Sequence, residues 1–140
     1  MDVIRLVQVT EQPLDASLMQ SLVADPAAGA VVTFSGDVRG VDHGRQVHAL
    51  TYEGHPSAAE VLREVAEQIA AEFDLIGLAV AHRIGELQVS DAALVAVVST
   101  AHRGPAFTAC QALVDLTKAK LPVWKHQVFA DGTDEWVNCA

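Results

Sequence analysis

Residues that could do acid–base or nucleophilic chemistry are concentrated in one short segment of an otherwise acidic chain. The 140 residues carry a net charge of −9, yet all three lysines, Lys118, Lys120 and Lys125, lie close together. A lysine with an ordinary pKa of about 10.4 is protonated at neutral pH, but a nearby cation or burial lowers that pKa and frees the amine. The cluster indicates a site for an anion. Chance clustering on a solvated face explains the composition equally well.

Lys118 and Lys125 are the first candidates for catalysis. The sequence predicts a helix over 105–120 and a strand over 123–129, with Pro122 between them because proline cannot continue the helical hydrogen bonds. The turn could bring both amines to one pocket. For each residue the alternative is an ordinary surface lysine, which the helix dipole favours near a C-terminus.

His102 and Arg103 are the second pair of candidates. They follow a predicted strand and precede a helix that begins with Gly104-Pro105. Backbone N–H groups at a helix start attract anions, and a guanidinium can hold a phosphate or carboxylate through two hydrogen bonds. The pair therefore suggests a phosphate clamp, with helix capping and solvation as the alternative.

Arg39 is a third candidate, because binding groups are common at the edges of loops. It follows a strand predicted over 29–39 and precedes a glycine-bearing segment, 40–46, which is predicted to be a mobile loop. The alternative is an exposed arginine that pairs with Asp37.

Several other classes of function are disfavoured. The six histidines show no metal-binding spacing, and neither Cys110 nor Cys139 lies in a CxxC, so we expect no metal, no cofactor and no disulfide scaffold. The apolar stripe of the helix predicted over 105–120 is expected to be Phe107, Cys110, Val114, Thr117 and Leu121, which places Cys110 in the core. A strongly acidic surface repels nucleic acid, and no apolar run is long enough for a membrane span. The N-terminus lacks the pattern of a secretion signal, so a cytoplasmic protein is expected.

The chain is expected to form one domain over 1–140 with an α+β fold. Alternating or valine-rich segments predict strands, and segments with helical spacing predict helices. Adjacent strands joined by short turns favour an antiparallel or mixed sheet with three helices packed on it. In order, the strands are expected at 2–10, 29–39, 47–53, 75–85, 92–101, 123–129 and 135–137, and the helices at 14–24, 57–73 and 105–120.

Four segments together resemble the large, catalytic subunit of molybdopterin synthase, the MoaE family. They keep the order and spacing of that family and cover most of the chain. The segments are GAVVTFSGDVRG (29–40), LTYEGHPSAAE (50–60), VAHRIGELQVSDAALVAVVSTAHRGPAFTAC (80–110) and DLTKAKLPVWKHQ (115–127).

The resemblance implies an α/β-hammerhead fold and a sulfur-transfer reaction. Enzymes of this family convert cyclic pyranopterin monophosphate to molybdopterin by installing a dithiolene. The sulfur comes from a thiocarboxylate on the C-terminal glycine, in a Gly-Gly ending, of a small ubiquitin-like partner. The large subunit is a homodimer that binds one small subunit at each end, which gives a heterotetramer.

The resemblance also implies roles for particular residues. Lys118 is expected to be the principal catalytic lysine and Lys125 its partner. Family dimers take the arginine equivalent to Arg39 from the neighbouring subunit. The expected substrate-binding residues are Asp37, Val38, Arg39, His102, Arg103, Lys118, Lys125, His126 and Gln127.

The sequence departs from the family pattern without losing a proposed catalytic residue. His55, Gln127 and Asp37 replace residue types common at their positions, Ser90-Asp91 replaces a glycine turn, and the tail after Trp136 is short. Two alternatives remain beside the enzyme: a non-catalytic module that binds a phosphorylated metabolite, and a structural subunit that has lost turnover. The presence of both lysines and the His-Arg pair argues against the structural subunit.

Overall fold

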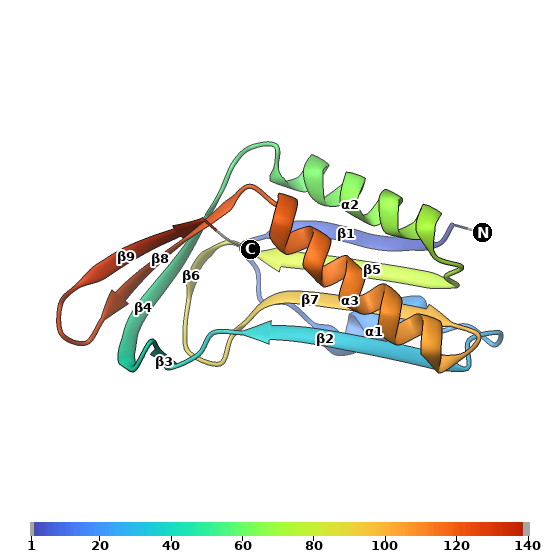
Figure 1. The fold of residues 1–140 in the computed structure, drawn as a ribbon, viewed down its shortest axis with the longest axis horizontal. Coiled ribbons are helices and arrows are strands. Elements are labelled where there is room, and N and C mark those ends of the chain that lie inside the picture. Colours follow the sequence, from blue (N-terminus) through green and yellow to red (C-terminus); the bar gives the residue numbers. More distant parts are fainter. Residues whose placement is uncertain (1, 139–140) are drawn as a thin grey trace.

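The computed structural model describes residues 2–138, so Cys139 lies outside the described part of the chain. The helices and strands follow one another as Figure 1 shows. In chain order they are β1 (Ile4–Thr10), α1 (Ala16–Val23), β2 (Ala30–Asp37), β3 (Val41–Asp42), β4 (Arg45–Gly54), α2 (Ala58–Glu72), β5 (Gly77–Arg83), β6 (Gly85–Leu87), β7 (Ala92–Thr100), α3 (Arg103–Lys120), β8 (Val123–Phe129) and β9 (Asp134–Asn138).

The first sheet has the strand order β1-β5-β7-β2 and is covered by helices on both faces. β1 and β5 are parallel, and the other neighbours are antiparallel. In Figure 1, α2 and α3 lie across the front of this sheet and α1 lies behind it. The two central strands are buried on both faces, which is why β5 and β7 are almost continuous apolar runs.

The helices form where apolar side chains recur at helical spacing. In α2 the buried residues Leu62, Val65, Ala66 and Ile69 share one face, as the sequence predicts, whereas Phe73, expected on the same face, is the C-cap residue. In α3 the predicted apolar stripe is wrong at one position, because Phe107 is 61% exposed. The buried face of α3 is formed instead by Ala106, Ala109, Cys110, Leu113, Val114 and Thr117.

The second sheet has the strand order β3-β4-β8-β9, with β6 paired to β4. Figure 1 shows it projecting beyond the C-terminal end of α3. The mobile loop predicted over 40–46 is wrong. β3 and β4 form a tight hairpin there, and its turn residues, His43 and Gly44, have φ angles of 51° and 75°. Two positive φ angles suit a hairpin turn because they match the twist of the paired strands.

The predicted α+β architecture with three helices on a mixed sheet is confirmed, although the strands divide into two sheets. The short strands β3 and β6 were not predicted, and α3 begins at Arg103, two residues before the predicted start. Within residues 2–138, no helix is both long and apolar enough to cross a membrane.

Candidate functional site

Lys118 and Lys125 line the same cavity, as the turn around Pro122 suggests. Lys118 lies in the last turn of α3, whose C-cap residue Leu121 donates its backbone N–H to the Thr117 carbonyl. After Pro122 the chain enters β8, where Lys125 pairs with Tyr52 of β4. The helix end and the neighbouring strand therefore direct the two amines into one space.

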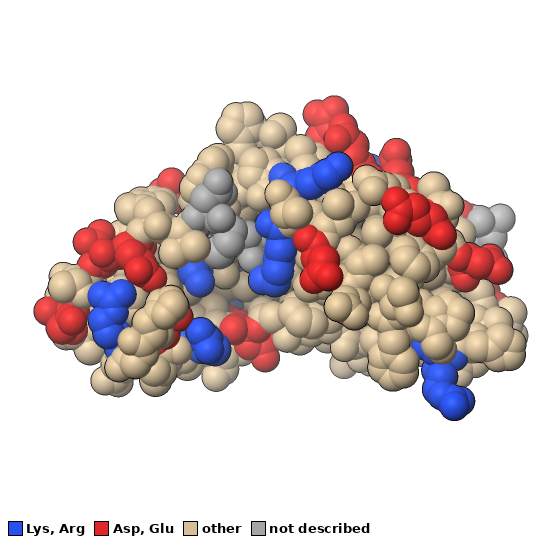
Figure 2. Space-filling model, in the orientation of Figure 1, with Lys and Arg blue, Asp and Glu red and all other residues tan. Residues whose placement is uncertain are grey.

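This cavity lies where the ends of the first sheet meet the second sheet. Its volume is about 210 Å³, and its polar lining includes the lysines as well as an imidazole, a phenol and a carboxylate. Figure 2 shows Lys and Arg side chains gathered near the C-terminal end of α3, where this face is hollowed. The lining residues are Gly36, Asp37, Tyr52, His82, Ala93, Leu94, Lys118 and Lys125.

Asp37 joins the cavity, whereas Val38 packs into the core. The Asp37 carboxylate accepts a hydrogen bond from the Ser35 hydroxyl and Arg39 pairs with Asp42, so the alternative pairing of Arg39 with Asp37 is not found. Val38 is 6% exposed, and its backbone N–H donates to the Asp91 carbonyl at 2.9 Å. Val38 therefore holds the end of β2 in place, and its backbone N–H already has a hydrogen-bond acceptor within the chain.

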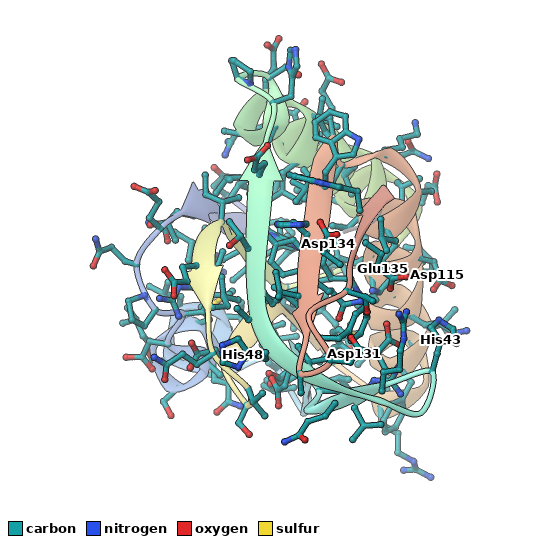
Figure 3. The ribbon with its side chains drawn as sticks, turned by 90° about the vertical axis from the view of Figure 1, so that its left-hand side faces the viewer. His43, His48, Asp115, Asp131, Asp134 and Glu135 are labelled. Carbon is teal, nitrogen blue, oxygen red and sulfur yellow. The ribbon has the colours of Figure 1, made fainter. Side chains whose placement is uncertain are left out.

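Arg39 and Gln127 are joined through Asp42. Arg39 Nη2 lies 3.1 Å from Asp42 Oδ1, and Gln127 Nε2 donates to Asp42 Oδ2 at 2.7 Å and to Glu135 Oε1 at 3.0 Å. Figure 3 labels Glu135 and shows it on β9 at the side of β8. The hydrogen bond from Gln127 is the main cause that lowers the pKa of Asp42, and the charges of His43, Lys125 and Arg39 act in the same direction. Neither Arg39 nor Gln127 is among the residues that line the cavity.

His126 points away from the cavity within one chain. Successive strand residues face opposite sides, so Lys125 and Gln127 share one face of β8 and His126 takes the other. There, His126 Nε2 lies 2.8 Å from Asp134 Oδ2, and its ring stacks on Trp136 at 4.4 Å. The structure thus does not bring His126 to the two lysines.

His102 and Arg103 lie at the opposite end of α3 from Lys118. Both are exposed, and His102 is the N-cap residue of the helix. At a rise of about 1.5 Å per residue, Arg103 is about 22 Å along the helix axis from Lys118. Figure 2 shows cationic side chains at both ends of this helix, with an acidic side chain and uncharged surface between them. In one chain, the His-Arg pair and the lysine pair do not share a cavity.

Sequence reasoning missed the two other polar side chains of the cavity lining, Tyr52 and His82. His82 is 0% exposed, and burial lowers its pKa to about 4, with the Lys118 charge acting in the same direction and the Arg83 carbonyl opposing it. The sequence feature that could have indicated His82 is the tripeptide Ala-His-Arg, which occurs at 81–83 and again at 101–103, in each case at the end of a strand. The first histidine is the one that reaches the lysine cavity.

Comparison with known proteins assigns the fold and the family. The MoaE protein family matches residues 9–120. A molybdopterin synthase catalytic subunit from Thermoplasma volcanium is 34% identical, over 93% of this chain and 96% of that protein. Molybdopterin synthase catalytic subunit 1 from Mycobacterium tuberculosis is 36% identical, over 93% of this chain and 88% of that protein.

Solved structures agree with these relatives. A crystal structure of molybdopterin synthase from Staphylococcus aureus superimposes with a TM-score of 0.86 at 29% identity, covering 92% of this chain and 94% of that chain. A protein–protein complex of subunits 1 and 2 of molybdopterin-converting factor from Helicobacter pylori shares the fold, with a TM-score of 0.69 at 18% identity, covering 98% and 90% of the two chains. The family match spans most of the sequence, and the chain therefore belongs to the MoaE family.

Proposed function

We propose that the cavity between α3 and β8 is the active site of a molybdopterin synthase, in which this chain is the catalytic subunit. The chain takes sulfur from the C-terminal thiocarboxylate of a small ubiquitin-like subunit. Two such transfers, one sulfur atom each, to cyclic pyranopterin monophosphate form the dithiolene of molybdopterin. The observation that carries the proposal is the convergence of Lys118 and Lys125 in one cavity of a MoaE family member.

The residue types suit this chemistry. The substrate is anionic, and two ammonium groups in a partly enclosed cavity attract it. Displacement at a thiocarboxylate develops negative charge on oxygen, which a lysine N–H can stabilise. Lys118, at the end of α3, serves either this role or proton transfer to the opening cyclic phosphate. Lys125 holds the substrate beside it.

We further propose that two copies of the chain complete each site. The cavity of about 210 Å³ is smaller than most ligand sites, which span roughly 300–1,000 Å³. His102 and Arg103 are too far along α3 to reach the lysines of their own chain. In a homodimer, the start of one α3 can supply the clamp for the lysines of the other copy. One small subunit at each end then makes a heterotetramer.

An apolar surface supports this pairing of two copies. A second cavity, of about 400 Å³, lies between β2 and α3 and is lined by Phe34, Phe107 and Val114, among other residues. β2 is an edge strand of the first sheet, and Phe107 of α3 is exposed beside it. An exposed apolar patch next to an edge strand suits a protein–protein contact.

The test is a reconstituted reaction. The purified protein is incubated with cyclic pyranopterin monophosphate and a thiocarboxylated small subunit, and the dithiolene product is measured. We expect product only when all three components are present and the small subunit ends in a thiocarboxylate rather than a carboxylate. Substrate binding without product would instead favour a non-catalytic module for a phosphorylated metabolite.

A further inference from the structure

His82 is a buried histidine that takes no part in the proposed reaction as described above. It lies near the end of β5 on the same sheet face as Leu78 and Val80, which belong to the core beneath α2 and α3. It is 0% exposed and lines the cavity that contains Lys118 and Lys125. Burying a polar ring costs free energy unless both of its ring nitrogens make hydrogen bonds.

The hydrogen bond at one ring nitrogen determines which nitrogen carries the proton. His82 Nδ1 lies 2.7 Å from the Arg83 carbonyl oxygen, which can only accept, so Nδ1 is the donor. Burial lowers the pKa of His82 to about 4, and the ring is therefore neutral at pH 7. A neutral imidazole with its proton on Nδ1 presents a lone pair at Nε2.

No group within residues 2–138 satisfies that lone pair. His82 Nε2 is buried and lacks a hydrogen-bond partner, and an unsatisfied buried acceptor lowers the stability of the fold. The ring is also held in place, because Tyr52 packs against it edge-on with the ring centroids 5.0 Å apart and the planes at 80°. His82 Nε2 is therefore an acceptor that points in a fixed direction at the wall of the cavity and has no donor, which is rare for a buried polar atom.

Lys118 is the lining residue best suited to supply the donor. A lysine ammonium has three N–H donors and no acceptor. Its flexible side chain can reach the buried His82 Nε2, whereas the rigid ring system of a pterin substrate cannot. The charge of Lys118 already acts on His82, so the two side chains are near one another. When a substrate enters, water leaves the ammonium, and its N–H groups need acceptors within the cavity.

We propose that His82 is a positioning residue for Lys118, whose ammonium donates a hydrogen bond to His82 Nε2 in the substrate-loaded cavity. This inference rests on the proposed function and deepens it. One N–H of Lys118 is then held by the imidazole and another is directed at the substrate. Because His82 is neutral, it orients the ammonium without cancelling the charge that attracts the anion.

Two substitutions separate the two ring nitrogens. In His82→Asn, the side-chain amide can still donate to the Arg83 carbonyl, but the acceptor at Nε2 is lost. In His82→Gln, the amide oxygen can reach the Nε2 position. We expect His82→Asn to lower kcat about 10–100-fold with KM changed less than about 3-fold, and His82→Gln to stay within about 5-fold of the wild type. His48→Asn, at an exposed histidine of β4 labelled in Figure 3, is the control and should leave kcat unchanged.

A double-mutant cycle excludes a merely structural effect. If His82 acts through Lys118, then His82→Asn should lower kcat no further in a Lys118→Ala background. Independent losses that multiply would overturn the proposal, and so would equal losses in His82→Asn and His82→Gln. Circular dichroism and thermal unfolding check that each variant folds.

A measurement without turnover keeps this inference separate from the proposed function. ¹⁵N NMR of His82 should show the proton on Nδ1 in the free wild-type protein. Addition of cyclic pyranopterin monophosphate alone should shift the Nε2 resonance in the wild type but not in Lys118→Ala. A proton on Nε2, or the same shift in both proteins, would refute the role of His82. Failure of the reconstituted reaction with this NMR response intact would count against the proposed function only.

Discussion

Lys118 and Lys125 line one cavity although one belongs to helix α3 and the other to strand β8. Their proximity depends on the turn at Pro122 and on the pairing of β8 with β4, which places Lys125 opposite Tyr52. Lys120 lies in the same last turn of α3 as Lys118 but is not among the residues that line the cavity. The chain thus contains its own control for the effect of a nearby positive charge.

Lys118→Ala should lower the rate of dithiolene formation at least about 100-fold, as expected for loss of a proton-transfer or oxyanion-stabilising group. Lys120→Ala removes the same charge from the same helix turn and should retain nearly full activity. The rate is measured under single-turnover conditions with thiocarboxylated small subunit in excess. Equal losses in the two variants would show that only the local charge matters.

Arg103→Ala and Lys118→Ala should complement each other when they are mixed. Each variant alone should be nearly inactive, Arg103→Ala mainly through weaker substrate binding. In the proposed homodimer, a mixed pair would contain one site with Arg103 from one copy and Lys118 from the other, so random exchange should restore about a quarter of wild-type activity. The measurement is activity after unfolding and refolding of the mixture. Activity that stays at the level of the separate variants would argue against a shared site.

Gln127→Ala should destabilise the fold by about 2 kcal/mol at pH 7, because Gln127 donates to the charged Asp42. The pKa of Asp42 is below its ordinary value of 3.8, so ionised Asp42 favours the folded state above that pH. This contribution is lost as the pH falls below 3.8 towards the folded-state pKa, and the effect of the substitution should shrink there. Urea unfolding at pH 7 and pH 3 tests this, with exposed Gln46→Ala as the control. A loss of stability equal at both pH values would contradict the role of Asp42.

Asp15→Ala should cost about 1 kcal/mol of stability, because the Asp15 side chain accepts the backbone N–H of Leu18 at the start of α1. Thermal unfolding gives the comparison. Asp74→Ala removes an exposed carboxylate outside any helix or strand and should change the free energy of unfolding far less. Similar melting temperatures for Asp15→Ala and the wild type would show that the cap contributes little.

The sequence predicted the elements whose residues carry a local signal. The helical spacing of Leu62, Val65, Ala66 and Ile69 identified α2, and the alternation from Val123 to Phe129 identified β8 with both ends correct. The β3–β4 hairpin was not predicted because its turn is His43-Gly44 and not the more usual Asn-Gly. Phe107 was misassigned because spacing alone could not show which side of α3 faces the sheet.

The sequence by itself determined the residue types available for chemistry, the family, and the turn that could join Lys118 to Lys125. Only the tertiary structure decided that His82 reaches those lysines, that His126 faces away from them, and that Arg103 lies at the far end of the same helix. These facts depend on strand pairing and helix packing between segments distant in the chain. The spacing of residues along the sequence predicts local structure such as helices and turns. The register of strands and the direction in which their side chains point depend on how the whole core packs.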